Sequence, residues 1–172
     1  MEWSEKTGVA VTALRPTIVF GERDPIAADS MLAWLRSIQR GRFVFFDHQA
    51  VANYIYVGDV VIACVQSVQA SARGVFIVAD SCSLLEFVSA CANALQVPAP
   101  RFFVPLPLAY TLASLMQVIL PNSPLTGARV HALSNRTLYR SSRIDQIGWR
   151  PIFGYRVGLQ HTVAWYKRNK HL

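Results

Sequence analysis

The chain has 172 residues, of which 52% are hydrophobic. This is enough for one sizeable core, and the high apolar content suggests that part of the surface is normally covered by segments outside this sequence. The longest apolar run, residues 105–120, is shorter than the roughly 20 residues that cross a bilayer, so we expect no membrane span. The three cysteines have no metal-ligand spacing, which indicates reduced, buried thiols in a cytoplasmic protein without a metal site.

The net charge of +7 is unevenly distributed. Residues 1–128 carry eight basic and nine acidic side chains, whereas nine basic residues from Arg129 onward accompany Asp145 alone. Such a basic segment is compatible with nucleic acid, a membrane surface, a phosphate-bearing ligand or solvent. We expect no nucleic-acid partner.

The first predicted element is a strand over Val9–Leu14, where β-branched and small apolar residues indicate burial on both faces. Pro16 ends the strand because it has no N–H to donate, and Gly21 allows a turn into a polar loop. A helix is predicted over residues 27–40. Two short strands follow, over residues 42–46 and 54–57.

Asp59 is predicted to be the N-cap of the next helix. After a strand over residues 75–78, either Ser83 or Ser81 is predicted to cap the next helix, and Glu86 has the spacing of a capping box with Ser83. This helix is predicted to run to about Leu95. The remaining elements are a short strand at 102–104, helices from Pro107 and over 126–133, an extended segment at 137–139, one helical turn from a Ser142 cap to Gly148, and an amphipathic helix over 156–170. This order predicts an α/β fold.

Three segments carry a resemblance to a known family. They are LRPTIVFGERDP at 14–25, NYIYVGDVVIAC at 53–64, and YRSSRIDQIGWRPIFGYRVGLQHTVAWYK at 139–167. In this order they resemble the extended short-chain dehydrogenases/reductases, which are NAD-dependent epimerases and dehydratases. Their residue patterns are most similar to those of the 3β-hydroxysteroid-dehydrogenase-like branch. The resemblance implies the C-terminal part of a Rossmann-like fold, with its last parallel strands and a small substrate-binding α/β subdomain.

The resemblance also implies site residues. Pro16 and Thr17 would contact the nicotinamide of NAD or NADP. Substrate contacts would come from Ile18, Phe20, Arg23, Asn53, Tyr54 and Arg129. In nucleotide-sugar enzymes two arginines bind the diphosphate. Here Ala52 stands in the place of the first arginine, and Val130 or His131 in the place of the second. Arg129 could take over the role of the second. The substrate therefore stays open between a nucleotide sugar and an apolar alcohol.

Neither the glycine-rich phosphate-binding motif nor the catalytic dyad of the family is found in its expected place. The single Tyr-x-x-x-Lys, Tyr166 and Lys170, lies near the C-terminus and is interpreted as a chance pair on the last helix. Residues 1–7 resemble the end of the catalytic helix. We therefore expect residues 1–172 to be one truncated unit without its dinucleotide-binding half. We assign no catalytic residue and expect this chain alone not to bind NAD or NADP.

Two functions follow from these observations. The first is the substrate-binding C-terminal portion of an NAD(P)-dependent epimerase/dehydratase or hydroxysteroid-dehydrogenase-like oxidoreductase, inactive on its own. The alternative is a non-catalytic binding module that uses the basic C-terminal segment for an anionic partner. Because the first strand would lack a neighbour, we expect it to recruit the missing N-terminal half or a second copy of the chain.

Overall fold

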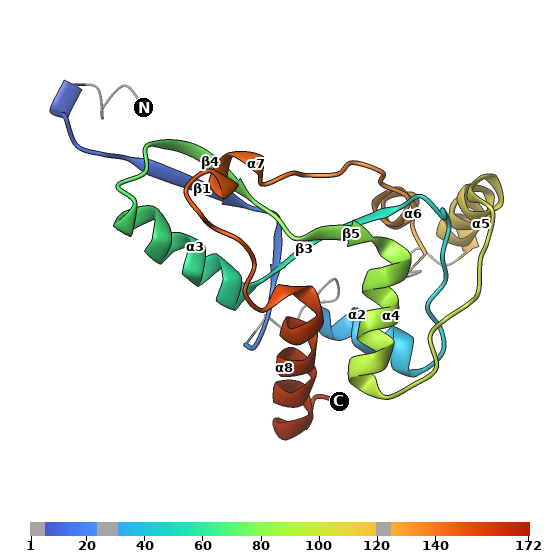
Figure 1. The fold of residues 1–172 in the computed structure, drawn as a ribbon. Helices are drawn as coiled ribbons and strands as arrows, with labels where there is room; N and C mark the ends of the chain where they lie inside the picture. The colour runs from blue at the N-terminus through green and yellow to red at the C-terminus, as the bar shows by residue number, and fades with distance from the viewer. Residues whose placement is uncertain (1–5, 24–30, 120–124) are drawn as a thin grey trace. The chain divides into compact units, whose positions relative to one another are not determined.

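The computed structural model describes residues 6–23, 31–119 and 125–172 (Figure 1). The chain divides into two compact units. Unit 1 comprises residues 1–26, 53–81 and 139–172, and unit 2 comprises residues 27–52 and 82–138. The elements are β1 (Thr12–Pro16), β2 (Ile18–Phe20), α2 (Met31–Gln39), β3 (Val51–Tyr56), α3 (Val57–Gln69), β4 (Gly74–Val78), β5 (Ser81–Ser83), α4 (Leu84–Leu95), α5 (Leu106–Ile119), α6 (Gly127–Leu133), α7 (Ser142–Asp145) and α8 (Gly154–Arg168).

The strands are parallel, as predicted for this fold class. β1 pairs with β4 from Thr12↔Gly74 to Pro16↔Val78, and β2 pairs with β3 from Ile18↔Tyr54 to Phe20↔Tyr56. β5 lies on the other side of β3 in the second sheet. The helix α3 connects β3 of one sheet to β4 of the other. The predicted α/β fold with parallel strands is therefore confirmed.

The core of unit 1 lies between the β1–β4 pair, α3 and the segment around α7. Its buried members are Ile55, Ala63, Ala72, Phe76, Val78, Ile144 and Trp149. Trp149 is fully buried, and its indole N–H donates to the carbonyl of Asp59 over 3.3 Å. The third sequence motif, which contains Trp149, is thus anchored to the start of α3.

The prediction of a first strand buried on both faces is wrong. The strand begins at Thr12 instead of Val9, and Ala13 and Arg15 are exposed. Among the described residues β1 pairs with β4 alone, so its other edge and much of one face have no covering element. The predicted end of the strand at Pro16 is confirmed.

Unit 2 is built from two helix pairs. α2 packs against α4, and an aromatic cluster joins them, in which the Trp34 ring lies 5.3 Å from the Phe43 ring and 6.4 Å from the Phe87 ring. α5 packs against α6 over a small core of Phe46, Ala109, Ala113 and Val130. The predicted strands at 42–46 and 102–104 are wrong, because pairing there is limited to one bridge between Phe45 and Phe103.

Several local predictions can be compared directly with the helices. The Ser83 hydroxyl accepts from the N–H of Glu86 over 3.2 Å, and the N–H of Ser83 donates to the Glu86 carboxylate over 3.1 Å, so the capping box is confirmed. The predicted Ser142 cap is wrong, since α7 begins at Ser142 and Ser141 precedes it without a side-chain cap. The predicted start of the helix at residue 27 lies outside the described residues.

Other predictions concern cysteines and membranes. Cys91 is buried and Cys82 is half-buried, but Cys64 is exposed on α3, so the prediction of three buried thiols is wrong. Position 64 lies on the face of α3 that points away from the core stripe formed by Asp59, Ala63 and Ser67. No helix in the described ranges is long and apolar enough to cross a membrane.

Candidate functional site

Unit 1 gathers its polar groups where β2 and β3 end. Because the two strands are parallel, their carboxyl ends lie at the same edge, which is where open α/β sheets bind ligands. The segment Gly21–Arg23 follows β2, and α3 begins at Val57 directly after β3. The side chains at this edge therefore form the candidate site.

Tyr56, the last residue of β3, is the centre of this edge. Its side chain is 6% exposed, and its hydroxyl donates to both carboxylate oxygens of Glu22, over 2.9 and 3.0 Å. The same hydroxyl lies 3.3 Å from Nδ1 of His161 on α8. One phenol thus connects the loop after β2, the end of β3 and the C-terminal helix.

Glycines make room for the Tyr56 ring. A Cβ atom on Gly158 would lie 2.5 Å from Cγ of the ring, and one on Gly58 would lie 2.6 Å from Cε1. A Cβ on Gly21 would lie 2.4 Å from Cγ1 of Val57. These distances are too short for real side-chain contacts, so α3 and α8 approach Tyr56 closely only because glycine stands at these positions.

Burial and the neighbouring Glu22 carboxylate raise the pKa of Tyr56 to about 12. The pKa rises because both effects penalise the phenolate, which would lose its hydration and face a negative charge. At neutral pH Tyr56 is therefore a fixed hydrogen-bond donor. This favours a role in holding Glu22 over a role as a proton-transfer group.

Asp59 is fully buried, but it is not the N-cap of α3. The helix begins at Val57, which places Asp59 in its first turn. Its Oδ1 accepts the N–H groups of Ile152 and Phe153 over 2.8 and 3.0 Å, and its Oδ2 accepts that of Gly154 over 2.9 Å. The predicted N-cap role is wrong, since the carboxylate binds the turn that leads into α8.

Asp80 also accepts a hydrogen bond from the first turn of α8. Its Oδ2 accepts the N–H of Tyr155 over 2.7 Å. Burial raises the pKa of Asp80, and the nearby negative charge of Asp59 adds to this, although the hydrogen bond from Tyr155 acts in the opposite direction. Two carboxylates, from α3 and from the end of β4, thus hold the N-terminus of α8, where the helix dipole favours negative charge.

The predicted cofactor residues lie at the end of β1. Pro16 pairs with Val78, and the N–H of Thr17 donates to the Val78 carbonyl over 3.0 Å. The Thr17 hydroxyl is buried and has no hydrogen-bond partner within the described parts of the chain. Ile18 next to it is 57% exposed.

The predicted substrate residues of unit 1 fall into two groups. Phe20 is 2% exposed and its ring lies 6.4 Å from that of Tyr54, so the structure brings these two together inside the fold. Asn53 is also buried, and its Oδ1 accepts from the Ser81 hydroxyl over 2.7 Å and from the Tyr139 N–H over 3.3 Å. Arg23 is exposed and has a left-handed backbone with φ of 64°.

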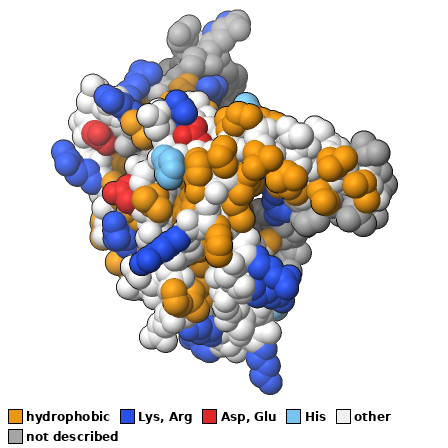
Figure 2. Space-filling model, turned by 90° about the vertical axis from the view of Figure 1, so that its right-hand side faces the viewer, with side chains coloured by type: hydrophobic (Ala, Val, Ile, Leu, Met, Phe, Trp, Pro, Cys, Tyr) orange, Lys and Arg blue, Asp and Glu red, His pale blue; other side chains and the backbone are white. Residues whose placement is uncertain are grey.

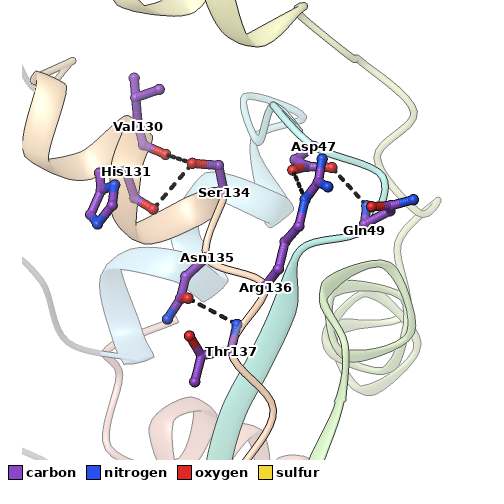
Figure 3. A network of polar contacts seen from close by, with 8 residues as sticks. All are labelled: Asp47, Gln49, Val130, His131, Ser134, Asn135, Arg136 and Thr137. Carbon is purple, nitrogen blue, oxygen red and sulfur yellow. Dashed lines mark hydrogen bonds and ion pairs between the residues drawn. The ribbon is translucent and has the colours of Figure 1, made fainter.

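Arg129 belongs to unit 2, where its N–H donates to the Thr126 hydroxyl that caps α6. Figure 3 shows the polar network of the same unit, in which Nε of Arg136 lies 2.7 Å from Oδ2 of Asp47. The hydrogen bond from Arg136, followed by that from the Gln49 N–H, lowers the pKa of Asp47. This network ties the segment after α6 to the loop before β3.

The sequence reasoning did not identify Glu22, Tyr56, His161 or Asp80. Glu22 follows Gly21 directly, and Tyr56 is two residues after Tyr54 on the same strand, so alternation could have placed Tyr56 with Tyr54 against Phe20. No local signal identifies His161, which is 105 residues from Tyr56 in the chain. Among the described residues no cluster of side chains could hold a metal ion.

Comparison with known proteins agrees with the motifs. Residues 3–73 match the 3-beta hydroxysteroid dehydrogenase/isomerase family. The resemblance to this family is confirmed. Two curated relatives from Arabidopsis thaliana, 3beta-hydroxysteroid-dehydrogenase/decarboxylase isoforms 1 and 2, are 25% and 24% identical over 92% and 95% of the chain. The chain spans 40% and 32% of their respective lengths.

Solved structures show the same fold. A nucleoside-diphosphate-sugar epimerase from Pseudomonas aeruginosa matches with a TM-score of 0.70 at 15% identity, covering 97% of this chain and 51% of its own. UDP-glucose 4-epimerase from Thermotoga maritima, solved with UDP-glucose, matches with a TM-score of 0.64 at 20% identity, covering 98% and 50%. The enzyme of that name from Thermus thermophilus, solved with NAD, has a TM-score of 0.61. The chain therefore has the fold of half of such an enzyme.

Proposed function

We propose that this chain is the substrate-binding C-terminal portion of an NAD(P)-dependent epimerase/dehydratase or hydroxysteroid-dehydrogenase-like oxidoreductase. The observation that carries the proposal is the match of nearly the whole chain to about half of each solved epimerase. The other half would supply the dinucleotide-binding glycines and the catalytic Tyr and Lys. On this proposal the chain has no turnover of its own.

The end of β1 would face the nicotinamide ring through Pro16 and Thr17. The buried Thr17 hydroxyl without a partner supports this, because such a group costs free energy unless something pairs with it. When bound, NAD or NADP would accept or supply the hydride. The residues of this chain would orient the ring, but no glycine-rich phosphate-binding motif is present in the 172 residues to hold the pyrophosphate.

The substrate would lie beside Ile18 at the start of β2, its pairing partner Tyr54 on β3, and Arg23 in the segment after β2. The exposed Ile18 supports an apolar alcohol, as does the buried Ala52 in place of a diphosphate-binding arginine. The epimerase neighbours instead support a nucleotide sugar. We propose these two substrate classes and treat their discrimination as part of the test.

The test begins with the coding sequence directly upstream of residue 1. That sequence should encode a glycine-rich dinucleotide motif and a Tyr-x-x-x-Lys, and the longer protein should bind NADH or NADPH and oxidise a 3β-hydroxysteroid or epimerise UDP-glucose. In that protein Thr17→Ala should raise the Kd for the cofactor, whereas Thr111→Ala on α5 should not. A longer protein without cofactor binding, or turnover by the present chain alone, would refute the proposal.

A further inference from the structure

His161 on α8 packs against two aromatic rings of unit 1. The centre of its imidazole ring lies 5.9 Å from that of Tyr56 and 5.9 Å from that of Phe153, and the latter two lie 5.5 Å apart. Exposed histidines are ordinary on this surface, as Figure 2 shows for one face of the molecule. What distinguishes His161 is that its ring is oriented with Nδ1 toward the Tyr56 hydroxyl, at 3.3 Å.

The hydrogen bonds around the Tyr56 hydroxyl have one possible direction. A carboxylate has no hydrogen to donate, so the phenol donates its single hydrogen to Glu22. The phenol oxygen is then left as an acceptor, and a hydrogen bond with His161 requires a hydrogen on Nδ1. The three side chains therefore form a chain of donors and acceptors that runs from His161 through Tyr56 to Glu22.

A proton on His161 stabilises this chain. A neutral imidazole has two tautomers, and the one with its hydrogen on Nε2 turns the lone pair of Nδ1 toward the phenol oxygen. An imidazolium has hydrogens on both nitrogens, so it always donates from Nδ1. Its positive charge also acts on the carboxylate at the other end of the chain, and charge-assisted hydrogen bonds are stronger than neutral ones.

The charged groups around the chain belong to two other segments. Glu22 and the exposed Arg23 follow β2, and Asp59 on α3 acts on Tyr56 through its negative charge. On α8 itself the residues one turn before and one turn after His161 carry no charge. Within the described parts of the chain, Glu22 accepts hydrogen bonds from Tyr56 alone. A proton on His161 therefore acts on Glu22 through Tyr56.

We propose that His161 is a proton-dependent latch for the loop after β2. With a proton on His161, the chain through Tyr56 holds Glu22, and the segment 21–23 is fixed to α8. Loss of this proton as the pH rises weakens the hold, because the second tautomer then competes and the positive charge is gone. His161 is thus a positioning residue, which acts through Tyr56 on a loop of the candidate site. This inference goes beyond the proposed oxidoreductase function and does not depend on it.

Urea unfolding of the chain at pH 5 and at pH 8 tests the proposal, since histidine changes its charge between about these values. Replacement of His161 by Gln should raise the unfolding constant relative to the unchanged chain. The ratio of the two constants should be about fivefold larger at pH 5, because only the unchanged chain gains the charge-assisted hydrogen bond. His131→Gln on α6 is the matched control, an exposed histidine of unit 2 whose replacement should give the same ratio at both pH values.

Two further variants identify the path. In a Tyr56→Phe background His161→Gln should lose its pH-dependent effect, because the chain is cut in the middle. In a Glu22→Gln background it should lose most of this effect, because the negative charge at the end of the chain is gone. A pH dependence that persists in the Tyr56→Phe background would overturn the proposal, as would a ratio for His161→Gln that is equal at both pH values.

Nuclear magnetic resonance of the ¹⁵N-labelled chain tests the effect on the loop itself. The amide signals of Gly21, Glu22 and Arg23 should shift between pH 5 and pH 8 with the same midpoint as the ring signals of His161. In Tyr56→Phe they should stay constant over this range, while the His161 ring still titrates. Loop signals that do not follow His161 in the unchanged chain would overturn the latch, even where stability depends on the histidine.

Discussion

The Tyr56 hydroxyl donates to both carboxylate oxygens of Glu22, 34 residues earlier in the chain, over 2.9 and 3.0 Å. The relationship matters because Glu22 lies between Gly21, which cannot carry a side chain, and Arg23, whose backbone is left-handed. A residue other than glycine adopts that backbone only where its surroundings hold it. Tyr56 therefore fixes the conformation of the loop that borders the proposed substrate edge.

Tyr56→Phe should lower the free energy of unfolding by about 1–2 kcal/mol, because Glu22 loses a buried donor while the ring still fills its slot. The loss should depend on alkaline pH. The pKa of Tyr56 is raised from 10.0 to about 12, so its contribution to stability is present below 10.0 and is lost as the pH rises toward 12. Urea unfolding at several alkaline pH values would show the difference between the two proteins shrinking in that window.

Tyr110→Phe is the control for this measurement, since Tyr110 is exposed on α5. It should change stability by less than about 0.5 kcal/mol at every pH. A constant difference between Tyr56→Phe and the unchanged chain up to pH 12 would contradict the role of the phenol as a protonated donor to Glu22.

Gly158→Ala should destabilise the chain, although alanine is the better helix former. In an unobstructed helix interior the change would add about 1 kcal/mol of stability. Here the new methyl group would lie 2.5–2.7 Å from three atoms of Tyr56, and overpacking of this kind costs about 1–3 kcal/mol. Gly127→Ala at the start of α6 is the matched control, because nothing lies within 4 Å of its Cβ position. Thermal unfolding that ranks the two variants in the opposite order would contradict the close packing around Tyr56.

The sequence predicted local features better than distant ones. The capping box of Ser83 and Glu86 was predictable because both partners lie within four residues. The role of Asp59 was not predictable, because the N–H groups that donate hydrogen bonds to its carboxylate lie 93–95 residues later. A carboxylate just after a strand has the same local pattern whether it caps its own helix or binds another turn, and only the folded chain distinguishes the two.

The same limit explains the wrong strand at 42–46. Phe43 and Phe45 are buried, as in a strand, but they belong to the aromatic cluster beside α2 and α4. Phe46 is also buried, but it packs in the small core of α5 and α6. Apolar residues in a segment indicate that it is buried. Whether it forms a strand also depends on whether another segment lies beside it and can pair with it. For the candidate site, the sequence predicted that the first strand ends at Pro16, but no local pattern indicated Glu22 or His161.

Asp59→Asn should lower the free energy of unfolding more than the other substitutions at buried polar groups. Asn has one accepting oxygen in place of two, so at least one of the three N–H groups at 152–154 would face an NH₂ group. We expect a loss of about 2–3 kcal/mol, typical of a buried hydrogen bond to a charged group. Asp145→Asn, on the exposed surface of α7, should cost less than about 0.5 kcal/mol. Equal effects in chemical denaturation would show that the turn before α8 is held by other groups.

Asp80→Asn should raise the free energy of unfolding at neutral pH, in contrast to Asp59→Asn. Burial, aided by the charge of Asp59, raises the pKa of Asp80 above its ordinary value of 3.8, so the ionised carboxylate opposes folding. The stability of the unchanged chain is therefore favoured below 3.8 and falls as the pH rises through the raised value. Asparagine cannot ionise but can still accept from Tyr155, so the variant should gain stability relative to the unchanged chain between acid and neutral pH. Asp80→Ala should show the same trend displaced to lower stability by the lost hydrogen bond, and urea unfolding across this range that finds no trend in either variant would refute the assignment.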